Sequence, residues 1–164
     1  MALIAEEVVE EWLNQQGYFT MRGVTLGRDE MDILAVKFTE GQPDLRHYEV
    51  QCSINPVSYI SCGNARKMSE RELVVSVDKW INKKFLQAKK VTLRNSLFLG
   101  QWSFYFVVNE VRYPEELDIF EKSPIITVVH WREVLKDLRN KKQSRFMASG
   151  RDLIDLMLMD GKQA

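Results

Sequence analysis

The sequence contains no long apolar run. None of its hydrophobic stretches approaches the roughly 20 residues that a helix needs to cross a bilayer, so no membrane-spanning helix is predicted. Cysteine is also scarce: Cys52 and Cys62 lack the spacing of a zinc knuckle, neither requires a disulfide, and a reducing compartment is expected. The start of the chain, MALIAEEVVEEW, is acidic and amphipathic, unlike a secretory signal or a transit peptide, which favours a cytoplasmic protein.

The chain also has no net charge, since its 23 Lys and Arg residues balance its 23 Asp and Glu residues. A net charge of zero argues against binding nucleic acid by bulk charge alone. The charges are unevenly distributed, however. Acidic residues crowd the first predicted helix, while basic residues gather in the middle of the chain and in the run RNKKQSR at 139–145. A local basic surface is compatible with this distribution.

Internal repeats, low-complexity stretches and long linkers are missing too, and 164 residues suit one domain, so we expect a single domain over residues 1–164. A chain of this length buries roughly two thirds of its unfolded surface, which is enough for a substantial core. The sequence matches no P-loop, dinucleotide-binding fingerprint or catalytic triad. Any chemistry must therefore come from residues that the fold brings together.

Hydrophobic periodicity predicts the first half of the fold. A helix over residues 3–16 ends at Gly17, and the strand YFTMRGV follows. Two further strands, EMDILAVKF and LRHYEVQC, are separated by a short connection, which predicts an antiparallel hairpin. Ser69 and Glu72 form the signature of a capping box, and this predicts the start of a helix over about residues 70–90.

In the second half, two apolar runs predict strands that are buried on both faces, WSFYFVVN at 102–109 and IITVVH at 125–130. Pro114 begins a short helix or turn, and WREVLKDLRN and GRDLIDLMLMD predict two more helices. The order mixes hairpins with crossovers, so we expect an α/β fold with a central mixed β-sheet flanked by helices. Apolar residues wrap most of the last helix, at 150–160, which predicts either deep burial or a homodimer interface.

Polar side chains interrupt the predicted hairpin at Asp32, Glu49 and Gln51. Residues i and i+2 of a strand share a face, so Glu49 and Gln51 point the same way. If the turn centres near residues 41 and 42, Asp32 lies opposite Gln51, and directly opposed Cβ atoms are about 5 Å apart. Two adjacent carboxylates repel unless a cation lies between them, and a hard divalent cation such as Mg²⁺ suits such oxygen ligands. The alternative is that these acids occupy a solvated strand face.

These residues, in this predicted order of elements, resemble the PD-(D/E)XK nuclease superfamily, whose restriction-endonuclease-like core runs helix, three-strand meander, helix, strand. The resemblance covers roughly residues 4–90 and is closest to the small resolvase-like members. It implies that Asp32 in EMDILAV and Glu49 in YEVQ hold a Mg²⁺ or Mn²⁺ ion. Glu6, eleven positions before the glycine that ends the first helix, matches an acidic residue of that family and would hold a second metal ion or its water. Alternatively, Glu6 is one of four acids that stabilise the N-terminus of a helix.

Gln51 departs from the family signature, which has lysine at this position. Some active members of the superfamily carry Gln or Glu there, and others place the lysine on the following helix. Lys79 and Lys83 are one helical turn apart and are candidates for such a cation, although a solvated helix face is the simpler interpretation of both. We also expect Lys79, Lys83, Arg66 and Lys67 to contact DNA phosphates.

Two functions follow from the resemblance. The first is a metal-dependent nuclease that hydrolyses the phosphodiester bonds of DNA, in which Gln51 orients the water or the phosphate. The second is a catalytically inactive nuclease-like module that binds nucleic acid or protein, and Gln51 together with the zero net charge favours it. Three acids gathered in one place without a cation would repel one another, so their retention favours the nuclease.

Overall fold

The computed structural model describes residues 2–53, 59–62 and 67–140. Along the chain its elements are α1 (Ala2–Asn14), β1 (Phe19–Leu26), β2 (Asp29–Thr39), β3 (Gln42–Gln51), α2 (Glu70–Ile81), the π-helical turn η1 (Asn82–Leu86), α3 (Ala88–Leu97), β4 (Trp102–Val108), α4 (Pro114–Glu121), β5 (Ile126–His130) and α5 (Trp131–Asn140). None of the described helices is both long enough and apolar enough to span a bilayer. The helix predicted at 150–160, and with it the predicted homodimer interface, lies outside the described residues.

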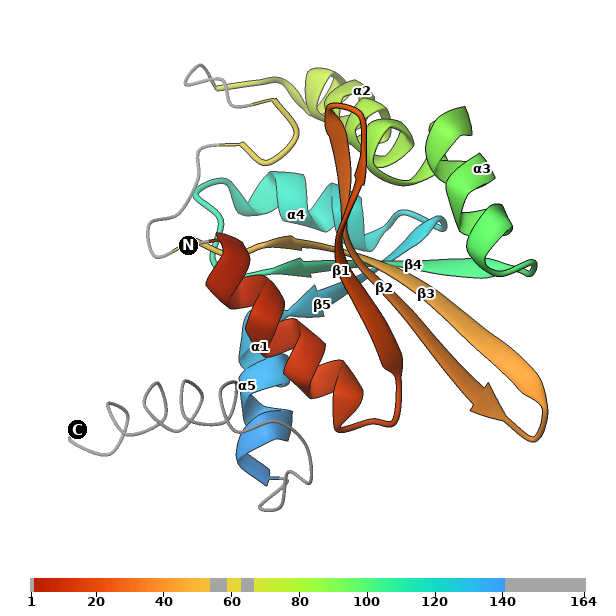
Figure 1. The fold of residues 1–164 in the computed structure, drawn as a ribbon. Coiled ribbons are helices and arrows are strands. Elements are labelled where there is room, and N and C mark those ends of the chain that lie inside the picture. The colour runs from red at the N-terminus through yellow and green to blue at the C-terminus, as the bar shows by residue number, and fades with distance from the viewer. Residues whose placement is uncertain (1, 54–58, 63–66, 141–164) are drawn as a thin grey trace.

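The described strands form one five-stranded sheet in the order β1-β2-β3-β4-β5 (Figure 1). The pairs β1–β2 and β2–β3 are antiparallel, whereas β3–β4 and β4–β5 are parallel. Parallel neighbours need a crossover connection, which α2, η1 and α3 supply between β3 and β4, and α4 between β4 and β5. The predicted α/β fold, with a mixed sheet and a core of helix, three-strand meander, helix and strand, is confirmed.

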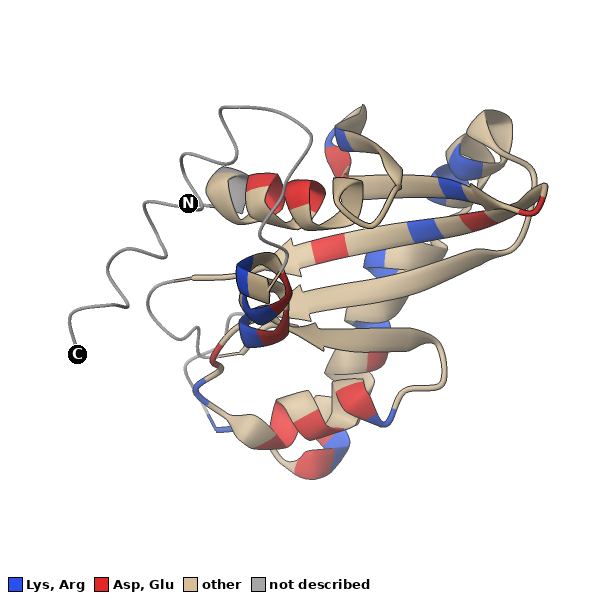
Figure 2. Ribbon diagram, turned by 90° about the horizontal axis from the view of Figure 1, so that it is seen from below, with Lys and Arg blue, Asp and Glu red and all other residues tan. Residues whose placement is uncertain are grey.

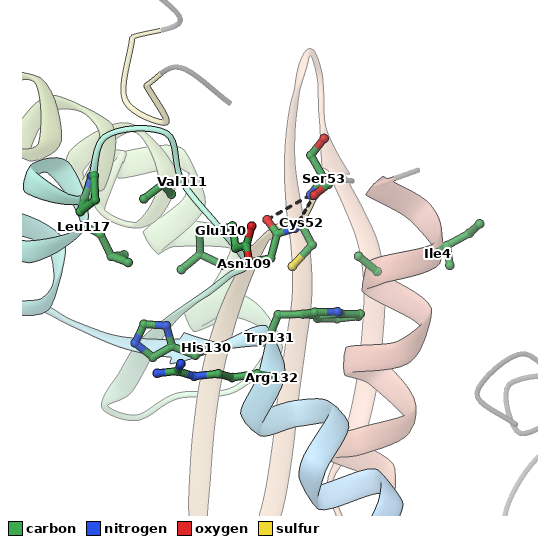
Figure 3. A pocket seen from close by; sticks show the side chains of 13 residues that line it. Ile4, Cys52, Ser53, Asn109, Glu110, Val111, Leu117, His130, Trp131 and Arg132 are labelled. Carbon is green, nitrogen blue, oxygen red and sulfur yellow. Dashed lines mark hydrogen bonds between the residues drawn. The ribbon is translucent and has the colours of Figure 1, made fainter. Parts of the chain in front are cut away.

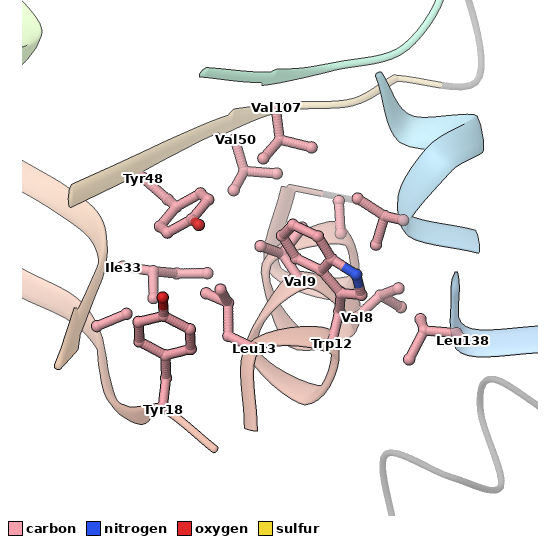
Figure 4. Packing of buried hydrophobic residues seen from close by; sticks show 13 residues of the cluster. Val8, Val9, Trp12, Leu13, Tyr18, Ile33, Tyr48, Val50, Val107 and Leu138 are labelled. Carbon is pink, nitrogen blue, oxygen red and sulfur yellow. The ribbon is translucent and has the colours of Figure 1, made fainter. Parts of the chain in front are cut away.

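Helices cover both faces of this sheet (Figure 1). On one face, Trp12 of α1 and Leu138 of α5 belong to a buried cluster with Tyr48 and Val50 of β3 (Figure 4). On the other face, α2 and α4 pack against β4 and β5. Because side chains alternate along a strand, Glu49 points away from α1, toward the face that α2 and α4 cover.

The hairpin between β2 and β3 closes through a two-residue turn. Thr39 pairs with Gln42, and the residues between them, Glu40 and Gly41, have φ angles of 52° and 81°. Two central residues with positive φ are the mark of a type I′ turn, whose twist matches that of the flanking strands. The turn is thus centred one residue earlier than the sequence predicted.

This turn sets the register of the candidate site. The ladder extends to the pair Ile33–Tyr48, and the next step along both strands places Asp32 opposite Glu49. The prediction that Asp32 lies opposite Gln51 was therefore wrong by two residues. Two residues are one full period of a strand, so this error does not by itself change the face that a side chain is predicted to occupy.

The helix predicted over about 70–90 is interrupted in the structure. It begins at Ser69 with the predicted capping box, but α2 gives way to η1, and Gln87 has an extended backbone at φ −56° and ψ 132°. A new helix, α3, follows and brings Lys90 and Arg94 onto the sheet, where each is only 2 % exposed. Single π-helical turns are frequent at functional sites, and here the turn redirects the chain toward the hairpin acids.

A buried carboxylate on α4 anchors the chain that precedes α2. Glu116 is fully buried and accepts hydrogen bonds from the backbone N–H groups of Ile60 (2.8 Å) and Ser61 (2.9 Å), and from the Ser61 hydroxyl (2.5 Å). A buried carboxylate with several donors is well compensated for its lost hydration. Glu116 therefore fixes the segment at Ile60 and Ser61, which lies between β3 and α2, to helix α4.

Candidate metal-binding and catalytic site

The site is built on the end of the β2–β3 ladder. Asp32 and Glu49 each lie one step beyond the last pair of that ladder, Ile33–Tyr48. The Asp32 carboxylate is partly buried and accepts a hydrogen bond from the backbone N–H of Val50 at 2.7 Å. This bond holds Asp32 beside β3, so the two carboxylates share one small volume on the sheet.

Glu49 is 1 % exposed, and basic groups surround its carboxylate. Lys84 Nζ lies 2.5 Å from Oε2, while His47 Nε2 and Lys90 Nζ lie 3.2 Å and 3.4 Å from Oε1. A buried charge without such partners would be very costly. The positive charge that the buried acid requires thus comes from η1 and α3, both of which follow α2 in the chain.

The two lysines differ in environment. Burial lowers the pKa of Lys84, but the carboxylates of Glu49 and Asp32 outweigh that effect, so the pKa lies above its ordinary value. For Lys90 the outcome is the reverse: burial dominates, and the pKa is lowered despite the nearby Glu49. Lys90 Nζ also donates to the backbone carbonyls of Glu30 and Lys84, at 2.7 Å and 3.0 Å. Lys84 is therefore the firmly charged amine of the site, and Lys90 ties α3 to the sheet.

The acids repel one another. Burial, and secondly the charge of Glu49, raise the pKa of Asp32 to about 6. Burial also raises the pKa of Glu6 on α1, and the carboxylates of Asp32 and Glu30 raise it further. The charges of the hairpin acids thus act on Glu6, whose predicted role as a holder of a second metal ion or its water stays a prediction. Additional positive charge at this point would relieve the repulsion.

The donor set fits magnesium better than zinc. No group of three or more His, Cys, Asp or Glu side chains in the described part of the chain is arranged to hold a metal ion. Structural and catalytic zinc sites use three or four protein ligands. Magnesium is commonly held by one or two carboxylates, with water and substrate phosphates completing its octahedral shell. Asp32 and Glu49 match that smaller set in residue type and number, although both oxygens of Glu49 have basic partners in this structure, Lys84 at Oε2 and His47 with Lys90 at Oε1.

The other predicted residues are placed as follows. Gln51 ends β3 on the same face as Glu49 and is partly buried. Lys79 and Lys83 are exposed, and no described contact joins either of them to Asp32 or Glu49. Lys67 is also exposed, and Arg66 lies outside the described residues. Among the described helices, α1 carries Glu but no Lys or Arg, and α3 carries Lys and Arg but no Asp or Glu (Figure 2). Contact of Lys79, Lys83, Lys67 and Arg66 with DNA stays a prediction.

The sequence interpretation missed Lys84, Lys90 and Arg94. For Lys84 a signal was present, because Trp80 and Ile81 lie on the buried stripe of α2 and residue 84 falls on the same stripe one turn later. Lys79 and Lys83 fall on the opposite, solvated side. For Lys90 and Arg94 there was no comparable signal, since their burial depends on the break at Gln87.

A separate hollow of about 700 Å³ lies beyond the carboxyl ends of β3, β4 and β5 (Figure 3). Trp131 and Cys52 line it, and Asn109 ties its rim by exchanging two hydrogen bonds with the backbone of Ser53. Neither the carboxylate pair nor Lys84 is among the residues that line it. The hollow is thus distinct from the carboxylate site.

No family model and no curated protein matches this chain. Among solved structures it is similar to AF1548, a protein of unknown function, with a TM-score of 0.50 and 14 % identity over 98 % of this chain and 79 % of that chain. It is also similar to MspJI restriction endonuclease, solved with a 27-mer oligonucleotide, with a TM-score of 0.41 and 13 % identity over 96 % of this chain and 31 % of that chain. The likeness to AF1548 supports the α/β fold, and neither likeness establishes an activity.

Proposed function

We propose that this protein is a metal-dependent nuclease that hydrolyses phosphodiester bonds in DNA, with Mg²⁺ or Mn²⁺ as its cofactor. The observation that carries the proposal is the group formed by Asp32, Glu49 and Lys84: the Asp32 carboxylate is held on the backbone N–H of Val50, next to Glu49, and the Lys84 amine lies 2.5 Å from Glu49. Carboxylates that hold a hard cation, next to a fixed positive charge, are the parts that phosphodiester hydrolysis needs.

Each residue has a role in this proposal. Asp32 and Glu49 would hold the metal ion, which when bound polarises a phosphate oxygen and lowers the pKa of a water molecule. Lys84 would stabilise the negative charge that develops on the phosphate in the transition state. Gln51 shares the face of Glu49 and would orient the water or the phosphate. Glu6 would hold a second ion or its water.

In the family signature a lysine occupies the position of Gln51, which carries no charge here. We therefore assign the role of that lysine to Lys84. The Lys84 side chain is 30 % exposed, whereas that of Lys90 is 3 % exposed. A group that meets a substrate phosphate must be reachable from solvent, which favours Lys84 over Lys90. The exposed Lys79 and Lys83 would instead contact DNA phosphates outside the reaction centre.

The experiment is a cleavage assay on a panel of DNA forms: supercoiled plasmid, flap, junction and single strand. With Mn²⁺ or Mg²⁺ at least one form should be nicked or cut, and EDTA or Glu49→Gln should abolish the cut. Glu40→Gln is the matched control, since Glu40 is an exposed acid at the turn of the same hairpin. An intact panel at micromolar protein would contradict the proposal.

A catalytically inactive module is the second candidate, and one observation favours it. Lys84 and Lys90 already supply positive charge to Glu49, so the buried acid is compensated without a metal ion. Such a module would bind DNA or a protein in EDTA as tightly as in Mn²⁺, and it would leave every DNA form intact. The same panel, combined with a binding measurement in each condition, separates the two candidates.

A further inference from the structure

His47 occupies a fully buried position between the candidate site and α3. It precedes Glu49 by two residues on the same face of β3, and its Nε2 lies 3.2 Å from Glu49 Oε1. On the other side of the ring, Nδ1 lies 3.1 Å from Nη1 of Arg94. The rings of Phe85 and Phe104 enclose the imidazole, with centroids 4.9 Å and 6.2 Å away.

Arg94 determines which nitrogen of His47 carries the proton. A guanidinium has five N–H donors and no acceptor, so the short contact to Nδ1 is a hydrogen bond only if Nδ1 lacks a hydrogen. A neutral imidazole then carries its hydrogen on Nε2, where it meets the acceptor Oε1 of Glu49. The geometry therefore specifies one tautomer, with a single direction of donation from Arg94 through His47 to Glu49.

Arg94 is itself held in a defined place. It is 2 % exposed, its Nη2 donates to the carbonyl of Phe85 at 2.7 Å, and its guanidinium lies 5.0 Å from the ring centroid of Phe104. A buried charge contributes little to stability compared with an apolar side chain of similar size. Packing alone does not call for a guanidinium at this position, and the group that Arg94 reaches is the imidazole that contacts Glu49.

We propose that His47 and Arg94 are positioning residues for Glu49. Arg94 sets the tautomer of His47, and the Nε2–H of His47 holds Oε1 of Glu49 so that Oε2 faces Lys84. The inference rests on the proposed function in one respect, namely that Glu49 is a ligand of the metal ion. Partners of this kind, which orient a metal ligand from behind, typically change metal affinity or activity by about 10- to 100-fold when removed.

The tautomer is measured directly by long-range ¹H–¹⁵N correlation on the full chain labelled with ¹⁵N-histidine, in EDTA. The chain has two histidines, and His130→Gln assigns the signals. We expect His47 to carry its hydrogen on Nε2, and we expect Arg94→Met, which keeps an unbranched apolar side chain but removes the donors, to disturb that state. The Nδ1–H tautomer or an imidazolium in the unaltered protein would overturn the inference. This readout needs no metal ion.

The positioning role is measured by titration of Mn²⁺ into folded variants. His47→Leu should weaken binding by about 10- to 100-fold, and His47→Gln should recover most of that affinity, because an amide N–H can donate to Glu49. Leu34→Val is the matched control, since Leu34 is fully buried and pairs directly with His47 in the ladder but carries no donor. Equal affinities in the Leu and Gln variants would overturn the positioning role.

The two experiments also separate this inference from the proposed function. If the unaltered protein binds no Mn²⁺, the proposed function fails and the positioning role fails with it. The tautomer measurement still shows whether the contact between Arg94 and His47 is correct.

Discussion

Lys84 Nζ lies 2.5 Å from Glu49 Oε2, although the two residues are 35 positions apart in the chain. The contact joins η1 to β3 and places an amine on the face of β3 that carries Glu49. The helical layer thus supplies a cation to the buried carboxylate of the strand. The negative charge of Glu49 is balanced by Lys84 and Lys90, and both lysines belong to the crossover between β3 and β4.

Loss of Asp32 should abolish metal binding. Asp32→Ala removes one of two proposed ligands, and a single remaining carboxylate that is paired with Lys84 holds a divalent cation poorly. Isothermal titration with Mn²⁺ should show a binding isotherm for the unaltered chain and for Glu40→Gln, and none for Asp32→Ala. Unchanged binding in Asp32→Ala would mean that the hairpin acids are not the site.

Loss of the Lys84 amine should impair the chemical step rather than binding. Lys84→Met keeps the aliphatic stem, and we expect the single-turnover cleavage rate to fall by about 100- to 1000-fold, as when one donor to a developing charge is removed. The Kd for DNA, measured in Ca²⁺ to prevent cleavage, should change little. A parallel loss of rate and affinity would show that Lys84 merely contacts phosphate.

Lys79 and Lys83 should behave in the opposite way. Each alanine variant should weaken DNA binding and lower the salt slope of log Kd by about one, because one phosphate contact is lost. The cleavage rate at saturating protein should stay at the unaltered level. Fluorescence anisotropy over a range of salt concentrations measures the slope, and a slope equal to that of the unaltered protein would exclude these two lysines from the interface.

The raised pKa of Asp32 should make the metal-free protein less stable as the pH rises. The native state keeps the Asp32 proton up to about pH 6, whereas the unfolded chain loses it near the ordinary value of 3.8. The native state binds more protons within that window, so the free energy of unfolding falls from about pH 4 to about pH 6 and stays lowered above it.

Asp32→Asn removes this penalty while its amide oxygen can still accept from Val50. In EDTA the variant should be more stable than the unaltered chain by on the order of 1–3 kcal/mol at about pH 7.5, and the gain should shrink at about pH 4.5. Urea denaturation at both pH values measures the difference. A gain that is the same at both would show that Asp32 is not the titrating group.

Loss of the Glu116 carboxylate should destabilise the fold. Glu116→Ala leaves two backbone N–H groups and one hydroxyl without their acceptor, which should lower the free energy of unfolding by about 2–4 kcal/mol. Glu115→Ala, at the exposed neighbouring position, should stay within about 0.5 kcal/mol of the unaltered chain. Chemical denaturation of both variants makes the comparison. Equal stabilities would show that the segment near Ile60 does not depend on this carboxylate.

Local signals in the sequence predicted much of the architecture. The alternation in EMDILAVKF and LRHYEVQC predicted the hairpin, the two apolar runs predicted the parallel strands β4 and β5, and Ser69 with Glu72 predicted the start of α2. These signals depend on neighbours within a few residues, so they can be read directly from the sequence. The shared face of Glu49 and Gln51 was predicted for the same reason, because the period of a strand is two.

Register and helix length were predicted less well. The turn at Glu40 and Gly41 is one residue earlier than expected, because a glutamate with positive φ is uncommon and its sequence gives no warning of it. The break between η1 and α3 contains neither proline nor glycine. Nothing local marks it, although the residues on either side of it, Phe85 and Lys90, are both buried.

The sequence by itself determined the class of fold and the antiparallel hairpin that carries Asp32 and Glu49, since both follow from periodicity and from short connections. Only the tertiary structure decided which cations reach those acids. Lys84, Lys90 and Arg94 arrive through the β3–β4 crossover, where helix position is set by the packing of side chains distant in sequence. Burial then gives these contacts their strength, because removal from water makes each buried charge depend on a specific partner.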